Sequence, residues 1–485
     1  MSRNRRAEGL EPKAEEMLEF VRLAGERLVA HLASVSAQRA SAIEGGLEAA
    51  RKVVEPLPEE GERFESLMDL YFDELLPKGY NMQSPGALSY VTGGGLFHAA
   101  LAEFIAAATN PYVGYWFASP GCATIERTVI RWFCDLVDFP AEADGILTSG
   151  GSMANLTAIV AARTARLGGD LSRGVVYASD QVHHSVEKAL AFAGFSRANL
   201  RIVASDDRCR LDPNVLARAV ARDEAEGLRP FMVVATAGTT NTGAVDDLEA
   251  LADLTERKRL WLHVDAAYGG FFALTERGRQ RLAGIGRADS IVLDPHKSLF
   301  LPFGTGCLLA RRRSDLLSAC SLHSEYLETV VKAGEELGAT NAADLSPELS
   351  RSFRGLRVWL PIKLLGAAKF REYLDEKLDL ARWAADELRA MDGVELLAEP
   401  ELSTVAFRVL PTGATNEQLD ALNRRILEGI NRRGRVHLSA TCVRGSYALR
   451  ICVLAFRAHR ESIAACLEDL RDVMKLEPLT NGGSK

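Results

Sequence analysis

Short apolar, β-branched runs alternate with stretches of helical character along the middle of the chain, from about residue 120 to residue 310. Such alternation predicts an α/β fold in which a largely parallel sheet is covered by helices on both faces. The expected strands are 145–148, 174–178, 201–203, 231–235, 261–264, 290–293 and 306–309.

The segments that flank this region have other patterns. Helical periodicity over about 13–55 predicts N-terminal helices, and the small and aromatic residues of 80–118 predict a loop-and-helix segment packed against a partner. Residues 310–350 are polar and without clear periodicity, so we expect a mobile segment there. A small α+β domain is expected to follow, with a long helix from Leu356 to about Met391, strands at 403–410, 435–438 and 447–453, helices at 415–432 and from about 460, and a disordered tail from 480.

Composition and charge narrow the class of protein. The chain has 485 residues, of which 47% are hydrophobic and 25% are charged, as in ordinary globular proteins. The net charge of −7 argues against general binding to nucleic acid or to a membrane surface. No apolar stretch reaches the roughly 18 residues of a membrane span, and the first residues lack an apolar leader. The eight cysteines form no C-x-x-C pair, which predicts reduced thiols, no metal site and a cytoplasmic protein.

Ligands of such folds bind beyond the carboxyl ends of the strands, so the residues after each run are candidates for chemistry. After the first run, Gly150, Gly151 and Ser152 precede a helix. The glycines allow close approach of an anion, and the helix start and the serine offer N–H and hydroxyl donors. The alternative is an ordinary turn in which Ser152 caps the helix. The chain has no G-x-G-x-x-G after a first strand and no Walker-type loop, which disfavours nucleotide binding.

The second and fourth runs end in polar segments. Two adjacent histidines, His183 and His184, follow the second run and open a helix. Adjacent histidines point in different directions and make a poor metal-binding pair, so we expect one to cap or pack while the other faces a ligand. Thr240 lies among small hydroxyl residues after the fourth run. Taken alone, each segment is also consistent with a simple helix cap or a polar loop.

The last strand ends add a carboxylate and an amine. Asp265 directly follows an apolar strand, where an unpaired carboxylate is costly. It therefore either forms a structural salt bridge or meets a cationic ligand such as a protonated pyridine, and the small Ala267 leaves room for a flat ring. In "DPHKS" (294–298), Lys297 either extends its stem to solvent or is an amine in a partly dry site, where desolvation favours the neutral nucleophile.

Together, these strand ends describe a pocket for pyridoxal 5′-phosphate (PLP), because an anion cradle, a flat-faced histidine, a buried carboxylate and an amine follow one another in chain order. We expect the phosphate on the Gly-Gly-Ser turn and the ring between His183 and Ala267. Asp265 is expected at the pyridine nitrogen, and Lys297 is expected to bond covalently to the cofactor's aldehyde.

At this point the chain resembles the group II PLP-dependent amino-acid decarboxylases, which include aromatic-L-amino-acid, glutamate and cysteine-sulfinate decarboxylases. The resemblance covers roughly residues 60–475. The matching segments are "SPGCATIE" (119–126), "SDQVHHSVEKA" (179–189), "VATAGTTNTGAVDDL" (234–248), "WLHVDAAYGG" (261–270), "DPHKS" and "SRSFRGLRVW" (350–359).

The resemblance implies a fold-type I homodimer with a mostly parallel, seven-stranded sheet and the active site at the subunit interface. It implies an N-terminal helical segment (1–100) that packs on the partner subunit, a large PLP-binding domain (101–370) and a small C-terminal domain (371–485). The implied catalytic residues are Lys297, His183, Asp265 and His296; the implied cofactor contacts add Gly150, Gly151, Ser152, Thr240, Ala267 and Asp294; the implied substrate contacts are Tyr90 and Arg450.

Two departures from the family pattern affect the reaction and the substrate. The family's mobile loop usually carries a tyrosine that protonates Cα, but the corresponding place here is near Thr340, Asn341 and Ala342, and Tyr326 matches an earlier position. Either another group donates the proton, such as His323 or His183, or the chain is not a simple decarboxylase. The segment 84–95 has Tyr90, but the residues near it are smaller than in the aromatic-rich version of the family's animal aromatic decarboxylases. No aromatic substrate is therefore predicted from this segment.

The sequence therefore predicts decarboxylation of an L-amino acid to the amine and CO2. The alternatives are an aldehyde-forming oxidative reaction or another PLP lyase reaction, because of the missing tyrosine, and a catalytically silent scaffold. Intact Lys297 and Asp265 argue against the scaffold.

Overall fold

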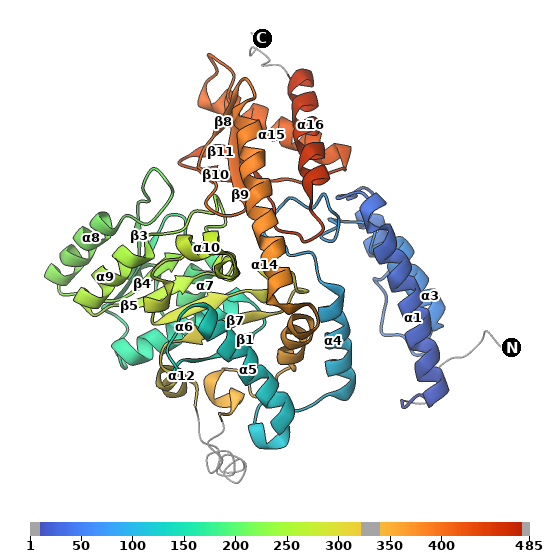
Figure 1. Ribbon diagram of the computed structural model, residues 1–485, viewed down its shortest axis with the longest axis horizontal. Helices are drawn as coiled ribbons and strands as arrows, with labels where there is room; N and C mark the ends of the chain where they lie inside the picture. The colour runs from blue at the N-terminus through green and yellow to red at the C-terminus, as the bar shows by residue number, and fades with distance from the viewer. Residues whose placement is uncertain (1–9, 322–339, 478–485) are drawn as a thin grey trace.

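A seven-stranded sheet forms the centre of the computed structural model, which describes residues 10–321 and 340–477 (Figure 1). The strand order is β1-β7-β6-β5-β4-β2-β3. β7 runs antiparallel to both of its neighbours, and the other pairs are parallel, which confirms the predicted α/β class with a mostly parallel sheet. The strands are β1 Asp144–Thr148, β2 Gly174–Ser179, β3 Leu200–Val203, β4 Arg229–Thr236, β5 Trp261–Asp265, β6 Ser290–Leu293 and β7 Gly306–Ala310.

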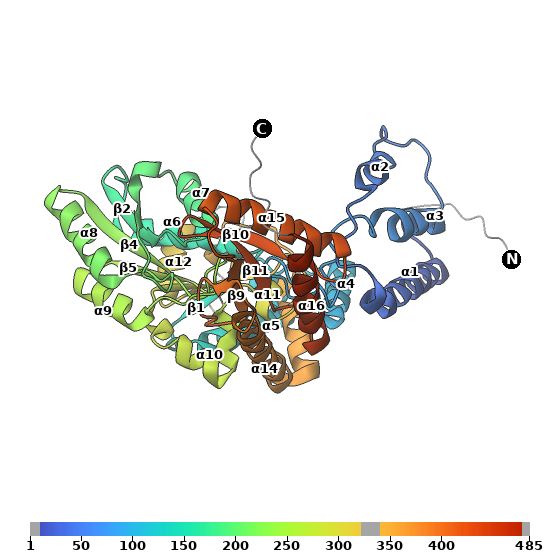
Figure 2. The ribbon, with the colours of Figure 1, turned by 90° about the horizontal axis from the view of Figure 1, so that it is seen from above.

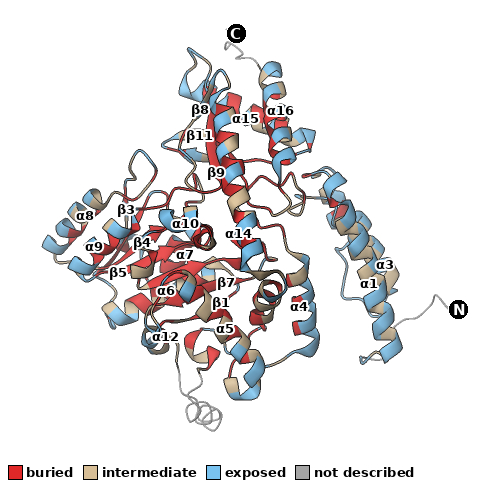
Figure 3. Cartoon of the chain, viewed as in Figure 1, coloured by how far each residue is buried: buried red, intermediate tan, exposed pale blue. Residues whose placement is uncertain are grey.

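Helices cover both faces of this sheet, and Figure 3 shows its strands as the most deeply buried part of the chain. Successive residues of a strand point to opposite faces, so Leu147 of β1 joins the core on one face and Ile146 joins the core on the other. One core includes residues of α5 (Pro120–Leu136), α8 (Pro213–Ala225), α9 (Leu248–Lys258) and α14 (Arg354–Arg389). The other includes residues of α6 (Gly151–Arg166), α7 (His184–Phe192) and α12 (Arg313–Cys320).

A smaller, antiparallel sheet follows at the C-terminal end, with the strand order β10-β11-β9-β8. The long helix α14 reaches it from the large sheet, and Pro361 and a non-helical Gly366 (φ 74°) interrupt its hydrogen bonding. Leu380 and Leu388, near the helix's end, pack in the small domain's core. The elements of this part are β8 Val394–Leu396, β9 Thr404–Val409, β10 Ser439–Val443, β11 Ser446–Cys452, α15 Asn416–Arg433 and α16 Arg460–Leu476. The large part also contains α4 Phe97–Thr109, α10 Glu276–Arg281 and α11 Pro295–Ser298.

Two local predictions are wrong. The strand expected at 435–438 is displaced, because β10 begins at Ser439; His437 instead exchanges backbone hydrogen bonds with Gly86 and Leu88 at 2.8 and 3.1 Å. The expected lack of regular structure over 310–350 fails near both ends, where α12 and a 3₁₀ turn at Ala342–Leu345 form. Residues 322–339 and the predicted disordered tail from 480 lie outside the described residues.

The N-terminal helices stand to one side of the large and small domains (Figures 1 and 2). They are α1 (Ala14–Ser34), α2 (Gly46–Arg51) and α3 (Phe64–Asp69), and no residue of α1 is buried. Leu18, Val21 and Val29 are 72%, 50% and 58% exposed, and their helical spacing places them along one stripe. We call α1–α3 the N-terminal arm. Within the described residues, no helix combines the length and apolar composition of a membrane span.

Candidate active site

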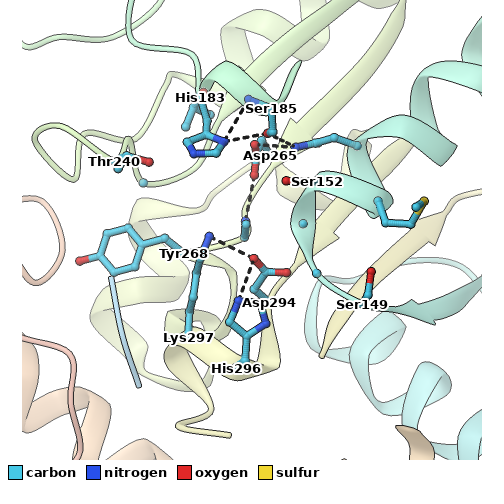
Figure 4. Close-up of a pocket in the computed structure, with 17 residues that line it drawn as sticks. Ser149, Ser152, His183, Ser185, Thr240, Asp265, Tyr268, Asp294, His296 and Lys297 are labelled. Carbon is cyan, nitrogen blue, oxygen red and sulfur yellow. Dashed lines mark hydrogen bonds and ion pairs between the residues drawn. The ribbon is translucent and has the colours of Figure 1, made fainter. Parts of the chain in front are cut away.

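A cavity of about 350 Å³ lies at one edge of the large sheet, beyond the carboxyl ends of β1, β2, β4, β5 and β6 (Figure 4). Its size is within the range of about 300–1,000 Å³ that is common for small-molecule sites. Ten residues expected to hold the cofactor all line it, although they come from five different strand ends. These residues are Gly150, Gly151, Ser152, His183, Thr240, Asp265, Ala267, Asp294, His296 and Lys297.

The turn after β1 forms one side of the cavity. α6 begins at Gly151, and the first N–H groups of a helix have no acceptor within it. Gly151 lies so close to Asp294 that a Cβ atom would come within 2.9 Å of Oδ2. A glycine is therefore needed for this approach, and the helix start presents donors that suit a phosphate.

Asp265 ends β5 and is 6% exposed. Its Oδ1 accepts the N–H of Ala267 at 3.2 Å, and its Oδ2 accepts from Asn155 Nδ2 at 3.1 Å. None of the ion pairs formed among residues 10–321 and 340–477 involves Asp265, so the alternative of a structural salt bridge is not realised there. The carboxylate is stabilised by hydrogen bonds only, which leaves it available for a cationic group of a ligand.

His183 combines the two roles that the sequence left open. Its side chain caps α7, because Nδ1 accepts the backbone N–H of Ser185 at 3.3 Å and lies 2.7 Å from Ser185 Oγ. The same ring lines the cavity, whereas the neighbouring His184 is exposed and does not. Burial lowers the pKa of His183, although Asp265 opposes this effect.

Lys297, His296 and Asp294 converge on the opposite wall (Figure 4). Lys297 Nζ lies 3.0 Å from Asp294 Oδ2, and His296 Nε2 lies 3.7 Å from the same oxygen. His296 Nδ1 donates to the carbonyl of Thr305 at 2.7 Å, and burial lowers the pKa of His296. Asp294 Oδ1 is buried and has no hydrogen-bond partner among the described residues. Lys297 is thus held inside the cavity instead of extending to solvent.

The two predicted substrate contacts do not line the cavity in this chain. Arg450 is 4% exposed, donates to the carbonyl of Thr240 and, at 2.9 Å, to Ser439 Oγ, so it is not a sheet-surface residue. Tyr90 has a left-handed backbone (φ 55°), and its N–H donates to Ser439 Oγ at 3.4 Å. Arg450 contacts the loop that carries Thr240, and contact of either residue with the substrate stays a prediction.

Several residues that line the cavity were not predicted from the sequence, including Asn155, Ser185, Thr236 and Tyr268. Asn155 had a detectable signal, because it lies four residues after Gly151 and thus on the same face of the helix. Tyr268 directly follows the small residues after Asp265. The sequence could not assign either of them a contact.

The cavity combines the amine of Lys297, the carboxylate of Asp265, which has no cationic partner among the described residues, and the start of a helix that suits an anion. This combination on an α/β sheet is typical of PLP-dependent enzymes. The chain matches the family described as "Pyridoxal-dependent decarboxylase conserved domain" over residues 48–410. It therefore belongs to the pyridoxal-dependent decarboxylase family.

Similar proteins agree with this assignment. The chain is 34% identical over 474 residues to the aromatic-L-amino-acid decarboxylase of Bacillus atrophaeus, covering 98% of this chain and 97% of that protein. It is 32% identical over 414 residues to tryptophan decarboxylase 1 of Oryza sativa subsp. japonica, covering 80% of each. The crystal structure of Oryza sativa TDC with PLP and tryptamine has a TM-score of 0.91 at 28% identity, over 97% of this chain and 100% of that chain. The protein is a PLP-dependent carboxy-lyase that decarboxylates an amino acid.

The residues present fit PLP. The close approach at Gly151 and the start of α6 suit the phosphate, and Asp265 lacks the cation that a pyridinium would provide. Lys297 Nζ faces into the same cavity as the only lysine among its described lining residues. These groups come from separate strand ends, and the fold brings them to one cavity.

Proposed function

We propose that the protein decarboxylates a neutral, aromatic L-amino acid to the corresponding amine and CO2. The names of the similar enzymes from Bacillus atrophaeus and Oryza sativa support an aromatic substrate. Charge supports it independently: among the described lining residues, the only basic side chains are His183, His296 and Lys297, and Lys297 is paired with Asp294. A substrate with a second carboxylate would meet no arginine in this lining, and burying an unpaired carboxylate is unfavourable.

The side chains of the cavity have separable roles in this reaction. When bound, PLP accepts the electrons that remain on the substrate's α-carbon as CO2 leaves. Asp265, held by two N–H donors, keeps a proton on the ring nitrogen so that the ring can accept these electrons. Lys297 would bond to the cofactor's aldehyde, and Asp294 would hold its amine group within the cavity. His183 and Ala267 would contact the ring.

The product depends on how Cα receives its proton, and one observation favours a second candidate. At the place of the family's loop tyrosine, Thr340 Oγ1 accepts from Arg313 at 2.9 Å, and Asn341 Oδ1 accepts the N–H of Trp116 at 3.1 Å. Neither residue, nor the buried Ala342, has an acidic proton to offer. His323 lies outside the described residues. The second candidate is therefore oxidative decarboxylation, in which O2 and water are consumed and aldehyde, CO2, ammonia and hydrogen peroxide are formed.

One experiment separates these reactions. The PLP-loaded enzyme is incubated with tryptophan, tyrosine, phenylalanine, glutamate and 2,4-diaminobutyrate, and amine, aldehyde, CO2 and O2 consumption are measured. We expect one amine per CO2 from an aromatic substrate, without O2 consumption. Aldehyde with O2 consumption would support the second candidate, and turnover of glutamate alone would overturn the aromatic assignment. The Lys297→Ala variant is the control and is expected to lose turnover by several orders of magnitude.

We also infer that the protein is a cytoplasmic homodimer in which the N-terminal arm packs on the partner subunit. The exposed apolar stripe Leu18, Val21 and Val29 supports this, because such a surface is unfavourable in water. All eight cysteines are free thiols, in agreement with a reducing compartment.

The arm gives a direct test of assembly. In analytical ultracentrifugation, the parent protein is expected to sediment as a dimer, and a Leu18→Asp/Val29→Asp variant is expected to dissociate at concentrations where the parent does not. Glu26→Gln, an exposed change on the same helix, is the matched control. A monomeric parent protein would refute the inference.

A further inference from the structure

A line of buried polar side chains runs beneath the cavity, from β5 and β6 to α6. Trp261 Nε1 donates to Ser290 Oγ at 2.8 Å, and this oxygen lies 2.7 Å from His263 Nδ1. His263 Nε2 lies 2.8 Å from Asn155 Oδ1. All four side chains are at most 1% exposed. Polar groups at this depth are costly unless each is hydrogen-bonded.

The line divides at Asn155, where it reaches Asp265 and Ser185, which line the cavity. Asn155 Nδ2 lies 3.1 Å from Asp265 Oδ2 and 3.1 Å from Ser185 Oγ. Ser185 Oγ in turn lies 2.7 Å from His183 Nδ1. One amide group therefore contacts both the carboxylate and, through a hydroxyl, the histidine.

The carboxylate end of this line fixes the direction of its hydrogen bonds, because an ionised carboxylate can only accept. Asn155 therefore turns its NH₂ toward Asp265, and its carbonyl accepts from His263 Nε2. Burial lowers the pKa of His263 to about 4, so its ring is neutral at pH 7 and carries its hydrogen on Nε2. His263 Nδ1 then accepts the hydrogen of Ser290 Oγ, which is compatible with the N–H that Ser290 Oγ accepts from Trp261.

The same reasoning fixes the second histidine. His183 Nδ1 accepts the backbone N–H of Ser185 and is therefore unprotonated, so Ser185 Oγ, which accepts from Asn155, donates its own hydrogen to the same nitrogen. His183 therefore carries its hydrogen on Nε2 and is neutral. Burial lowers the pKa of both histidines, that of His263 to about 4, in agreement with neutral rings. A neutral His183 is a poor acid, which argues against it as the proton donor to Cα.

We propose that Asn155 is a positioning residue for the decarboxylation, which acts through Asp265 and His183 together. Its amide orients the carboxylate of Asp265 and, by donating to Ser185 Oγ, directs the hydroxyl hydrogen of Ser185 to the unprotonated Nδ1 of His183. His263, Ser290 and Trp261 hold the amide in the orientation that allows both contacts.

The test uses the apo-protein first, so that its outcome does not depend on turnover or on the identity of the substrate. The protein is labelled with ¹⁵N-histidine, and the signals of His183 and His263 among the nine histidines are assigned from His183→Gln and His263→Gln variants. Both are expected to show a protonated Nε2 and an unprotonated Nδ1 at pH 7. Ser185→Ala should shift the Nδ1 signal of His183, which loses its hydroxyl donor but keeps the backbone N–H of residue 185, and should leave His263 unchanged, whereas Asn155→Leu should change both signals.

Cofactor binding provides the second readout. PLP is titrated into each apo-protein, and we expect Asn155→Leu to weaken binding by about tenfold or more, as for loss of a hydrogen bond to a charged group. Thr157→Val is the matched control, because Thr157 is also buried in α6 but donates only to the carbonyl of Met153, at 2.9 Å. It should change neither the histidine signals nor the affinity.

Two results would overturn the proposal. One is a His183 signal in Ser185→Ala that is identical to the signal in the parent protein. This result alone refutes the proposal if Asn155→Leu does not fold. The other is an Asn155→Leu protein that binds PLP as tightly as the Thr157→Val control. Neither result would affect the proposed aromatic substrate, which is tested by product analysis of the parent enzyme.

Discussion

His263 should make the stability of the protein depend on pH well below neutrality. Its ring is fully buried, and burial lowers its pKa from 6.5 to about 4, although the nearby Asp265 opposes the shift. In the unfolded chain the ring has an ordinary pKa of about 6.5. Between these two pH values the unfolded state binds the extra proton, so the free energy of unfolding must fall as the pH is lowered through this window.

The size of the effect follows from the two pKa values. Each pH unit between them corresponds to about 1.4 kcal/mol. Relative to pH 7, His263 should therefore reduce the free energy of unfolding by about 2 kcal/mol at pH 5 and by about 3 kcal/mol at pH 4. Carboxylates also titrate in this range, so the quantity to measure is the difference between the parent and a His263→Gln variant. Glutamine can still donate to Asn155 but does not titrate.

Equilibrium urea unfolding of the apo-proteins at fixed protein concentration, followed by tryptophan fluorescence, measures this difference at pH 7, 6 and 5. The advantage of the parent over His263→Gln is expected to shrink by about 2 kcal/mol from pH 7 to pH 5. Replacement of the exposed His184 by glutamine is the control and should leave the pH dependence of the parent unchanged. A parent-to-variant difference that stays constant to within about 0.5 kcal/mol would show that His263 is not held neutral.

Three further predictions concern close packing and a buried ion pair. Gly151→Ala should cost about 1–3 kcal/mol of unfolding free energy and weaken PLP retention on gel filtration, because its Cβ would come within 2.9 Å of Asp294 Oδ2; unchanged retention would contradict the close approach. Arg351→Met should cost about 3–5 kcal/mol by urea unfolding, since it leaves Glu126 as an unpaired buried charge, and adding Glu126→Leu should recover part of the loss. Phe407→Ala, in the small domain's fully buried core, should cost about 3–5 kcal/mol, and a loss below about 1 kcal/mol would argue against tight packing there.

The large sheet could be predicted from the sequence because its strands are apolar on both sides. In β4, Val233 packs in the core of one face and Val234 in the core of the other, so the strand appears as an unbroken apolar run. The candidate site followed from the same pattern, since the polar residues after such runs must gather at one edge of the sheet. Asp265 and Lys297 were detectable because a carboxylate and an amine are unusual beside buried strands.

Other features depend on contacts that the sequence does not record. Val436 and Leu438 pack in the small domain's core, but the backbone of His437 between them pairs with Gly86 and Leu88 instead of with the sheet. The role of Asn155 depends on His263, which comes from a distant strand. Arg450 fits the pattern of a substrate-binding arginine, yet its guanidinium is engaged by Thr240 and Ser439. Spacing alone cannot reveal such partners.

The reversed direction of β7 has a consequence for the order in which the site forms. Leu293 of β6 pairs with Cys307 of β7, so the segment that carries Lys297 is closed by strands that are near neighbours in the sequence. Thr148 of β1, by contrast, pairs with Gly306 across a long stretch of chain. Local contacts require little loop closure and tend to form early in folding. The segment that carries Lys297 should therefore become structured early, as a local unit. The turn after β1 should join it later in folding, so the complete cavity should form only after the strands around Lys297 have paired.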